Sequence, residues 1–391
     1  MLTSCALILI SGMILGTLCK KIQIPAIVGM IVAGILISPN LLNLVDSSLL
    51  EISSHIRQVA LVIILTRAGL TLDLADLKKV GRSALLMCFV PACLEIAGTI
   101  LIAPLIFPIT VMEAALMGSV LAAVSPAVVV PRMIALIEKK KGTCKGVPQL
   151  ILAGASVDDV FVIVVFTALC GWCSSGTASL TSFIQVPVSI VTGIVLGAVC
   201  GKLLSALYQR ITMTSMTQFL VLICCSFGLL ELETQISDVV PCSALLAIMS
   251  MALMIRHQNP NTAATLKLKY NAAWTIAEIF LFVLVGINVD LSYAIAAGPL
   301  AVFLVIGAMI FRMAGVGLSL CRTSFNRKER LFSMLAYTPK ATVQAAIGSI
   351  PLTMGLSCGP LIMTVSVISI LLTAPFGAFC IDRFSDALLD K

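Results

Sequence analysis

Charged residues are scarce in this chain. Asp, Glu, Lys and Arg make up 11% of its 391 residues, whereas a soluble domain typically carries about 25%. Hydrophobic residues account for 60%, and the mean hydropathy is +1.12. This composition excludes an ordinary soluble domain and predicts an integral membrane protein that lies among lipids.

The motifs of catalysis and nucleotide binding are also missing. His55 and His257 are the only histidines, so no metal-ligand cluster is expected, and neither a GxGxxG nor a Walker A motif occurs. The sequence therefore predicts a protein that is not an enzyme, has no cofactor and is not an ATP-driven pump. The 14 cysteines lie mostly in apolar runs. For Cys170 and Cys173, which have CxxC spacing there, packing is favoured over a redox role.

Long apolar runs are abundant. A membrane-spanning helix needs about 20 mostly apolar residues. On this criterion, the sequence predicts an all-α polytopic protein with thirteen transmembrane helices. The predicted spans are 2–18, 24–44, 56–72, 83–107, 112–137, 147–172, 184–208, 217–232, 240–255, 272–290, 295–320, 331–350 and 358–381.

Basic residues follow a topological pattern. Most of the 25 Lys and Arg residues fall in alternate loops, and the opposite loops are acidic. Cytoplasmic loops are enriched in Lys and Arg. The pattern therefore predicts a multi-pass protein of the plasma (inner) membrane with its amino end outside and its carboxyl end in the cytoplasm. The net charge of +7 is explained by these loops, so lipid rather than nucleic acid is the expected partner.

The predicted spans divide into two similar halves within one membrane body, 1–391. Residues 1–172 form the first six-helix repeat, 184–208 a linker helix and 217–391 the second repeat, in inverted orientation. Pro126 and Pro131 interrupt the fifth span, and Pro339 interrupts the twelfth. Proline removes a backbone donor and breaks a helix. Paired broken helices in inverted repeats are typical of secondary transporters with a central binding site, although simple kinks are the plainer alternative.

Three charged residues are predicted deep in the membrane. Asp158 and Asp159 lie about 17 Å into the sixth span, and Lys340 lies about 14 Å into the twelfth, at about 1.5 Å per residue. Each would cost about 2.5 to 3.5 kcal/mol at the centre of a bilayer. We therefore expect Lys340 to neutralise Asp158, which leaves Asp159 as a surplus carboxylate. A salt bridge that only locks the helices together is the structural alternative.

A surplus carboxylate can hold either a proton or a small cation. Na⁺ and Li⁺ prefer oxygen ligands, so Asp159 is the predicted metal ligand. The other residues predicted to bind the ion or the proton are Asp158, Lys340, Ser125, Ser156 and Thr338. These residues predict a secondary antiporter that exchanges Na⁺ or Li⁺ for H⁺ by alternating access. A cation channel and a Na⁺-coupled symporter of a small organic anion are the alternatives.

A second pair of charges recurs in the fourth span of each half. Glu95 and Arg312 lie at depths that differ by about 6 Å, which an arginine side chain can bridge. We interpret them as a structural ion pair that joins the two halves.

Four segments together resemble a known family. They are "SPAVVVP" (125–131), "GASVDDV" (154–160), "LTRAGLTLD" (65–73) and "PKATVQAAIG" (339–348). They are similar to monovalent cation/proton antiporters, most closely to the NHA-type sodium/hydrogen antiporters with paired aspartates. The resemblance implies the antiporter fold, with a mobile core domain, a dimerisation domain and a homodimer. It also implies that Asp159 is the main ion and proton carrier and that Asp158 is the partner of Lys340. Asn288 stands where animal relatives are expected to have an acid.

Overall fold

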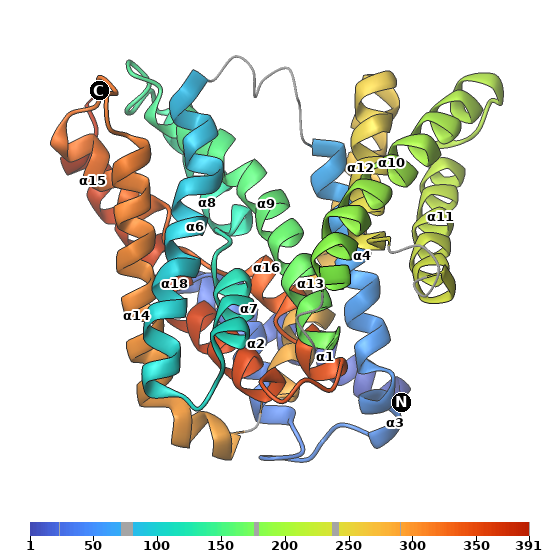
Figure 1. Cartoon of the computed structure of the whole chain (residues 1–391), viewed down its shortest axis with the longest axis horizontal. Coiled ribbons are helices and arrows are strands. Elements are labelled where there is room, and N and C mark those ends of the chain that lie inside the picture. Colours follow the sequence, from blue (N-terminus) through green and yellow to red (C-terminus); the bar gives the residue numbers. More distant parts are fainter. Residues whose placement is uncertain (23, 72–80, 176–179, 237–241, 290, 391) are drawn as a thin grey trace. The chain divides into compact units, whose positions relative to one another are not determined.

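The computed structural model describes the whole chain except residues 23, 72–80, 176–179, 237–241, 290 and 391. The described part contains helices and no strands (Figure 1). The chain divides into two compact units. Unit 1 comprises Met1–Ser54, Asp76–Val162 and Ile279–Lys391, and unit 2 comprises His55–Ala75 and Ile163–Glu278.

Unit 1 contains most of the helices. They are α1 (Leu2–Lys21), α2 (Ala26–Ile37), α3 (Ser47–Glu51), α6 (Gly81–Ile106), α7 (Val111–Leu121), α8 (Pro126–Glu138), α14 (Leu291–Ser319), α15 (Arg327–Ala336), α16 (Thr342–Ile347), α17 (Ile350–Thr353) and α18 (Gly359–Leu388). The first part of α9 (Val147–Ser175) and the last part of α13 (Pro260–Ile287) also belong to this unit. Unit 2 holds the rest of α9 and α13 together with α4 (Ser53–Thr71), α10 (Leu180–Arg210), α11 (Ser215–Ile236) and α12 (Ala244–Gln258).

The described residues include eight helices that are long and apolar enough to cross a membrane. Shorter apolar helices cover Ala26–Ile37, Phe161–Cys173 and Ala244–Gln258. Predicted spans 83–107 and 358–381 correspond to α6 and α18. The chain is therefore an all-helical, multi-pass protein, whereas the count of thirteen spans and the inverted repeat stay predictions.

Helices α6 and α14 pack closely because glycines line the face that α14 turns toward α6. A Cβ added to Gly307 would lie 2.6 Å from Cδ1 of Ile102, and one added to Gly315 would lie 2.6 Å from Cα of Pro91. The partner numbers fall along α6 as they rise along α14, so the two helices are antiparallel. This register places Glu95 beside Arg312, between the two contacts.

The helix of the predicted fifth span is interrupted between Leu121 and Pro126, where α7 ends and α8 begins. Pro126 occupies the first turn of α8, a position that tolerates the missing N–H. The missing N–H also leaves the Ala122 carbonyl without its usual helical donor. The Ser125 N–H donates to the Pro339 carbonyl at 2.7 Å, so it does not continue the helix either.

The helix of the predicted twelfth span is interrupted between Ala336 and Thr342, around Pro339. A capping box between Asn326 and Glu329 begins α15, which satisfies free N–H groups at that end. Because Ser125 and Pro339 are joined directly, the two interruptions meet. Unit 1 therefore brings non-helical backbone from both halves of the sequence to one place.

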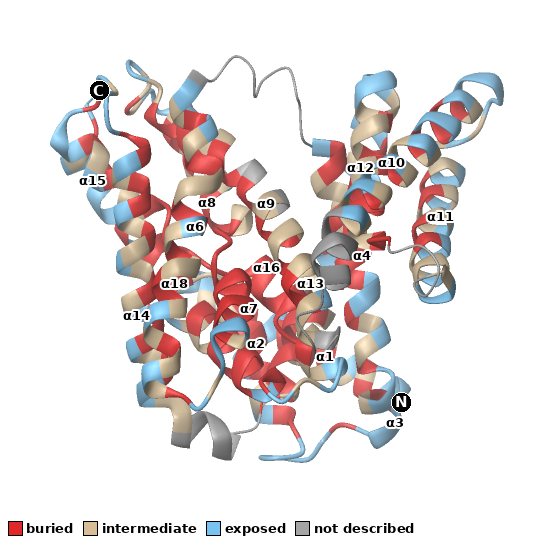
Figure 2. Cartoon of the chain, in the orientation of Figure 1, coloured by how far each residue is buried: buried red, intermediate tan, exposed pale blue. Residues whose placement is uncertain are grey.

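The interrupted segments lie in the most buried part of unit 1. All residues of α16 are buried, as are Ala114–Leu121 of α7, and Figure 2 shows this concentration around α7 and α16. Non-helical backbone at membrane depth requires such burial. A hydrophobic cluster that includes Met87, Val129, Ile151 and Phe332 packs beside these segments.

In unit 2, α10 and α12 pack through a row of glycines. Cβ atoms added to Gly193, Gly197 and Gly201 would lie 2.5, 2.1 and 2.4 Å from the carbonyl oxygens of Ser243, Ala247 and Met251, respectively. The numbers rise together along both helices, so α10 and α12 are parallel. Small residues at regular spacing allow membrane helices to approach backbone to backbone.

Candidate ion-binding site

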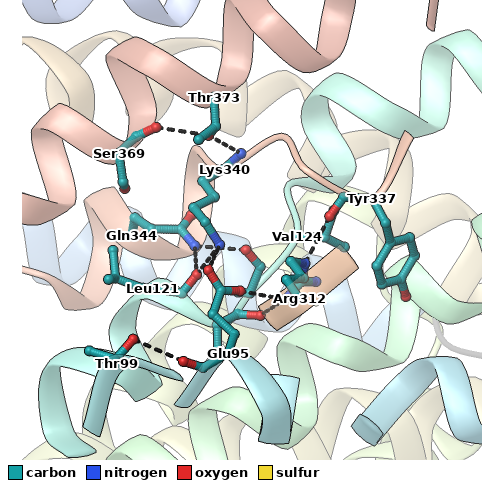
Figure 3. A network of polar contacts seen from close by, with 12 residues as sticks. Glu95, Thr99, Leu121, Val124, Arg312, Tyr337, Lys340, Gln344, Ser369 and Thr373 are labelled. Atoms are coloured by element: carbon teal, nitrogen blue, oxygen red, sulfur yellow. Dashed lines mark hydrogen bonds and ion pairs between the residues drawn. The ribbon is translucent and has the colours of Figure 1, made fainter. Parts of the chain in front are cut away.

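Four charged side chains meet at the interrupted helices of unit 1, and Figure 3 shows three of them, Glu95, Arg312 and Lys340. Glu95 on α6, Asp158 on α9, Arg312 on α14 and Lys340 between α15 and α16 are all at most 1% exposed. Two carboxylates thus face two cations in a region that excludes water. Such a cluster is tolerable only when the charges pair and hydrogen-bond with one another.

Arg312 is the centre of this cluster. Its Nη1 lies 2.9 Å from Oε2 of Glu95, and its Nη2 lies 2.8 Å from Oδ2 of Asp158. Its Nε donates to the Tyr337 carbonyl at 2.8 Å, and Nη1 also donates to the Ala122 carbonyl. The guanidinium therefore bridges both acids and both interruptions.

Lys340 pairs with Glu95, at 2.5 Å between Nζ and Oε1. The ammonium also donates to the Leu121 carbonyl, and the backbone N–H of Lys340 donates to Oγ1 of Thr373 at 2.9 Å. The partner predicted for Lys340 was Asp158, but the direct ion pairs of the structure are Lys340 with Glu95 and Arg312 with Asp158. Helix depth, the only measure the sequence provides, does not determine which neighbouring side chains meet laterally.

The ion pair predicted between Glu95 and Arg312 is present, but it is one side of a larger network. Asp158 adds to this network by accepting the Val124 N–H at Oδ2, over 2.7 Å. That bond satisfies a backbone donor in the first interruption. Charged side chains thus form hydrogen bonds with backbone groups that have no helical partner at the α7–α8 interruption.

Asp159 is the charge left over. It forms no ion pair among the described residues, and its Oδ1 atom is buried without a hydrogen-bond partner. Its neighbour Asp158 is fully engaged through Oδ2, while Asp158 Oδ1 is likewise buried and unpartnered. Because Glu95 and Asp158 are balanced by Arg312 and Lys340, Asp159 is a carboxylate whose counter-charge the network does not supply.

The remaining predicted ligands differ in their surroundings. The hydroxyl of Ser125 is buried and has no hydrogen-bond partner, so its oxygen is available. The hydroxyl of Thr338 donates to the Leu335 carbonyl at 2.8 Å, which leaves its oxygen lone pairs to accept. The side chain of Ser156 lies outside the described residues. No group of three or more His, Cys, Asp or Glu capable of holding a metal occurs in the described part of the chain.

Two residues of the network were not predicted from the sequence. Tyr337 supplies a carbonyl to Arg312 and places its ring 5.1 Å from the guanidinium carbon. Gln344 donates to two carbonyls of the first interruption. The only sequence signal for Gln344 is an uncharged amide in an apolar stretch just after a helix-breaking proline.

An all-helical chain with two interrupted helices that meet at buried, paired charges belongs to the class of multi-pass membrane transporters. The family model described as "Sodium/hydrogen exchanger, transmembrane" matches residues 6–384. The chain therefore belongs to the sodium/hydrogen exchanger family. This is a family of transporters and not of enzymes.

Relatives and a solved structure agree with this membership. The chain is 32% identical over 384 residues to sodium/hydrogen exchanger 9B2 of Homo sapiens, covering 94% of this chain and 70% of that protein. It is 30% identical to the exchanger of that name in Xenopus tropicalis, over 98% and 74% of the two chains. The sodium proton antiporter MjNhaP1 from Methanocaldococcus jannaschii matches with a TM-score of 0.83 at 19% identity, over 98% of this chain and 97% of that one. The chain thus has the fold of that antiporter.

Proposed function

We propose that this protein exchanges Na⁺ or Li⁺ for H⁺ across a membrane, and that Asp159 is the group that carries either ion. The observation that supports this most directly is the surplus charge at Asp159, beside a network in which every other charge is balanced. A buried carboxylate of this kind is stabilised by a proton or by a cation, but the two compete for the same oxygens. That competition couples one flux to the other.

The ligand shell of the cation is proposed to be made of oxygens. Asp159 contributes its carboxylate, and the hydroxyls of Ser125, Ser156 and Thr338 complete the shell with carbonyls of the interrupted helices. Hard monovalent cations favour such donors. The unpartnered oxygen atoms of Asp159 and Ser125 support this set. Na⁺ or Li⁺ is the cargo of the site, and no resident cofactor is proposed.

Alternating access follows from the charge of the site. With either a proton or a cation bound, Asp159 is neutralised. The bundle of α6–α9 and α14–α18 can then move so that the site opens to the other side of the membrane. With neither bound, a bare carboxylate would have to cross the membrane interior, which is costly. The empty site therefore crosses slowly, and exchange is favoured over leak.

The pairing of Lys340 supports a proposal about the stoichiometry. Lys340 is paired with Glu95 and not with Asp158 or Asp159, so we propose that it keeps its charge through the cycle. One proton then moves per Na⁺, and the exchange is electroneutral. A lysine that lost its proton on cation binding would add a second proton and make transport electrogenic.

We further propose that the protein lies in the plasma (inner) membrane as a homodimer, with the amino end outside and the carboxyl end in the cytoplasm. The alternation of basic and acidic loops supports the orientation. The thirteen spans, the repeats 1–172 and 217–391, and the linker 184–208 belong to the same proposal.

The proposal is tested in proteoliposomes with a pH jump in the presence of Na⁺, Li⁺ or K⁺, with and without a clamped membrane potential. We expect proton flux driven by Na⁺ and Li⁺, at a rate that the clamp does not change. Single-channel currents, or Na⁺ uptake that requires an organic anion and moves no protons, would contradict antiport. A rate that depends on the potential would contradict one-for-one exchange alone.

A further inference from the structure

Gln344 joins the two interruptions without carrying a charge. Its amide Nε2 donates to the Ala123 carbonyl at 2.8 Å and to the Leu121 carbonyl at 3.3 Å. Its Oε1 accepts the Ala341 N–H at 2.9 Å. The side chain is 1% exposed. One amide thus uses both its donor and its acceptor, and the two bonds go to different interruptions.

Carbonyls at the α7–α8 interruption have lost their ordinary helical donors. In an unbroken helix the Leu121 carbonyl would accept the Ser125 N–H, but that N–H donates to Pro339. The Ala122 carbonyl faces Pro126, which has no N–H. Side chains donate hydrogen bonds to these carbonyls instead. Lys340 and Gln344 donate to the Leu121 carbonyl, Arg312 donates to the Ala122 carbonyl, and Gln344 also donates to the Ala123 carbonyl.

These contacts distinguish Gln344 from the charged members of the network. Among the side chains that hold these three carbonyls, Gln344 alone is uncharged, so its removal leaves the balance of Glu95, Asp158, Arg312 and Lys340 unchanged. It fixes the segment 121–125, which ends at Ser125 and whose Val124 N–H is bonded to Asp158. Asp158 is in turn adjacent to Asp159 in the chain. Gln344 therefore acts on the ligand shell through backbone geometry, without contact to Asp159.

We propose that Gln344 is a positioning residue that sets the cation affinity of the site by holding the α7–α8 interruption in its binding geometry. This inference rests on the proposed function, because it assigns a role within the same site. Without the amide, two buried carbonyls lose a donor and turn toward other partners. The cation ligands that share this segment then shift, and the cation binds more weakly.

The test compares the wild-type chain with Gln344→Met, which keeps the length of the side chain but has no amide, and with Gln344→Leu, which is shorter and also has no amide. Neither variant adds a charge to the network of Glu95, Asp158, Arg312 and Lys340. Exchange is measured in proteoliposomes as a function of Na⁺ concentration. We expect both variants to raise KM for Na⁺ roughly tenfold, as the loss of a buried hydrogen bond implies, with a maximal rate within about twofold of wild type.

A second measurement does not depend on transport. The rise in melting temperature with added Na⁺ is recorded for the same proteins, and we expect the half-saturating concentration to shift by the same factor as KM. Ser369→Ala is the matched control. Ser369 is buried in the same unit, and its hydroxyl donates to the Ser366 carbonyl of its own helix, so both constants are expected to stay at the wild-type value.

A lower melting temperature with an unchanged KM would overturn the inference and make Gln344 merely structural. A fall in maximal rate at constant KM would overturn it as well. If the wild-type protein neither exchanges Na⁺ for H⁺ nor is stabilised by Na⁺, the proposed function itself fails. If wild type does both and the Gln344 variants match it, only the role of Gln344 fails.

Discussion

Arg312 holds two buried carboxylates, whereas Lys340 holds one. Breaking a buried ion pair by removing one partner typically costs about 3–5 kcal/mol, because the other charge is left uncompensated. Arg312→Ala leaves Asp158 without an ion-pair partner and frees the carbonyls of Ala122 and Tyr337. Lys340→Ala leaves no acid of the network unpaired, because Glu95 keeps Arg312. We therefore expect a larger loss of thermal stability for Arg312→Ala than for Lys340→Ala, measured by unfolding in detergent.

A matched control for this comparison is Arg132→Ala. Arg132 pairs with Asp382 at 3.1 Å, and the two side chains are 24% and 54% exposed. Exposed pairs contribute about 0–1 kcal/mol, so this variant is expected to unfold near the wild-type temperature. If Lys340→Ala proves as destabilising as Arg312→Ala, the inference that Arg312 stabilises both Glu95 and Asp158 is contradicted.

At the scale of the residue, the sequence identified the charged residues and the pair of Glu95 with Arg312, but not the partners of Asp158 and Lys340. Glu95, Asp158, Arg312 and Lys340 were recognisable because a charge in hydrocarbon is costly and needs an explanation. Which acid pairs with which cation depends on the lateral packing of α6, α9 and α14. The depth of a residue along its own helix does not determine this packing. Gln344 was not identified, because burying an uncharged amide costs less free energy than burying a charge.

At the scale of elements, helix contacts depend on particular glycines. A Cβ on Gly197 would lie 2.1 Å from the Ala247 carbonyl oxygen, so Gly197→Ala must push α10 and α12 apart. We expect a loss of about 1–3 kcal/mol, typical of overpacking, seen as a lower melting temperature.

Gly228→Ala in α11 is the matched control, since nothing lies within 4 Å of an added Cβ there. Alanine favours the helix over glycine by about 1 kcal/mol, so this variant is expected to be neutral or slightly more stable. Equal melting temperatures for the two alanine variants would refute the close contact of α10 with α12.

Pro126 and Pro339 predicted the two helix interruptions, because a missing N–H is a local property of the chain. The interruption predicted at Pro131 is wrong, because Pro131 lies inside α8. The bond between Ser125 and Pro339 was beyond prediction, since it joins residues far apart in the sequence. Helix ends were also missed. The predicted span 272–290 corresponds to α13, which begins at Pro260, because a helix can continue past its apolar part into charged residues such as Lys267 and Lys269.

At the scale of the whole molecule, the predicted topology places the loop after α14 in the cytoplasm. Cys321 is exposed in that loop, so it provides a native label. In a variant with the other cysteines replaced, we expect a membrane-impermeant thiol reagent to modify Cys321 only from the cytoplasmic side.

The opposite face is tested with Met354→Cys in a background without other cysteines. Met354 is 45% exposed and lies just after α17, on the side predicted to be outside. Modification of both positions from one side would contradict the predicted topology.

The sequence indicated the membrane class and the family resemblance, and the family match over residues 6–384 confirms the latter. It did not indicate how the chain divides into compact units. Unit 1 combines residues 76–162 with residues 279–391, so it draws on both predicted repeats. Hydropathy shows which segments enter the membrane, but not which of them pack together.

The most direct test of the proposed function is Na⁺-driven proton flux in proteoliposomes that contain Asp159→Asn, with Asp382→Asn as the matched control. Asparagine keeps the shape of the side chain but can neither hold a proton nor supply a negative charge to a cation. We expect Asp159→Asn to fold and to show no flux above empty liposomes, while Asp382→Asn exchanges at the wild-type rate. Wild-type exchange by Asp159→Asn would show that the ions are carried elsewhere.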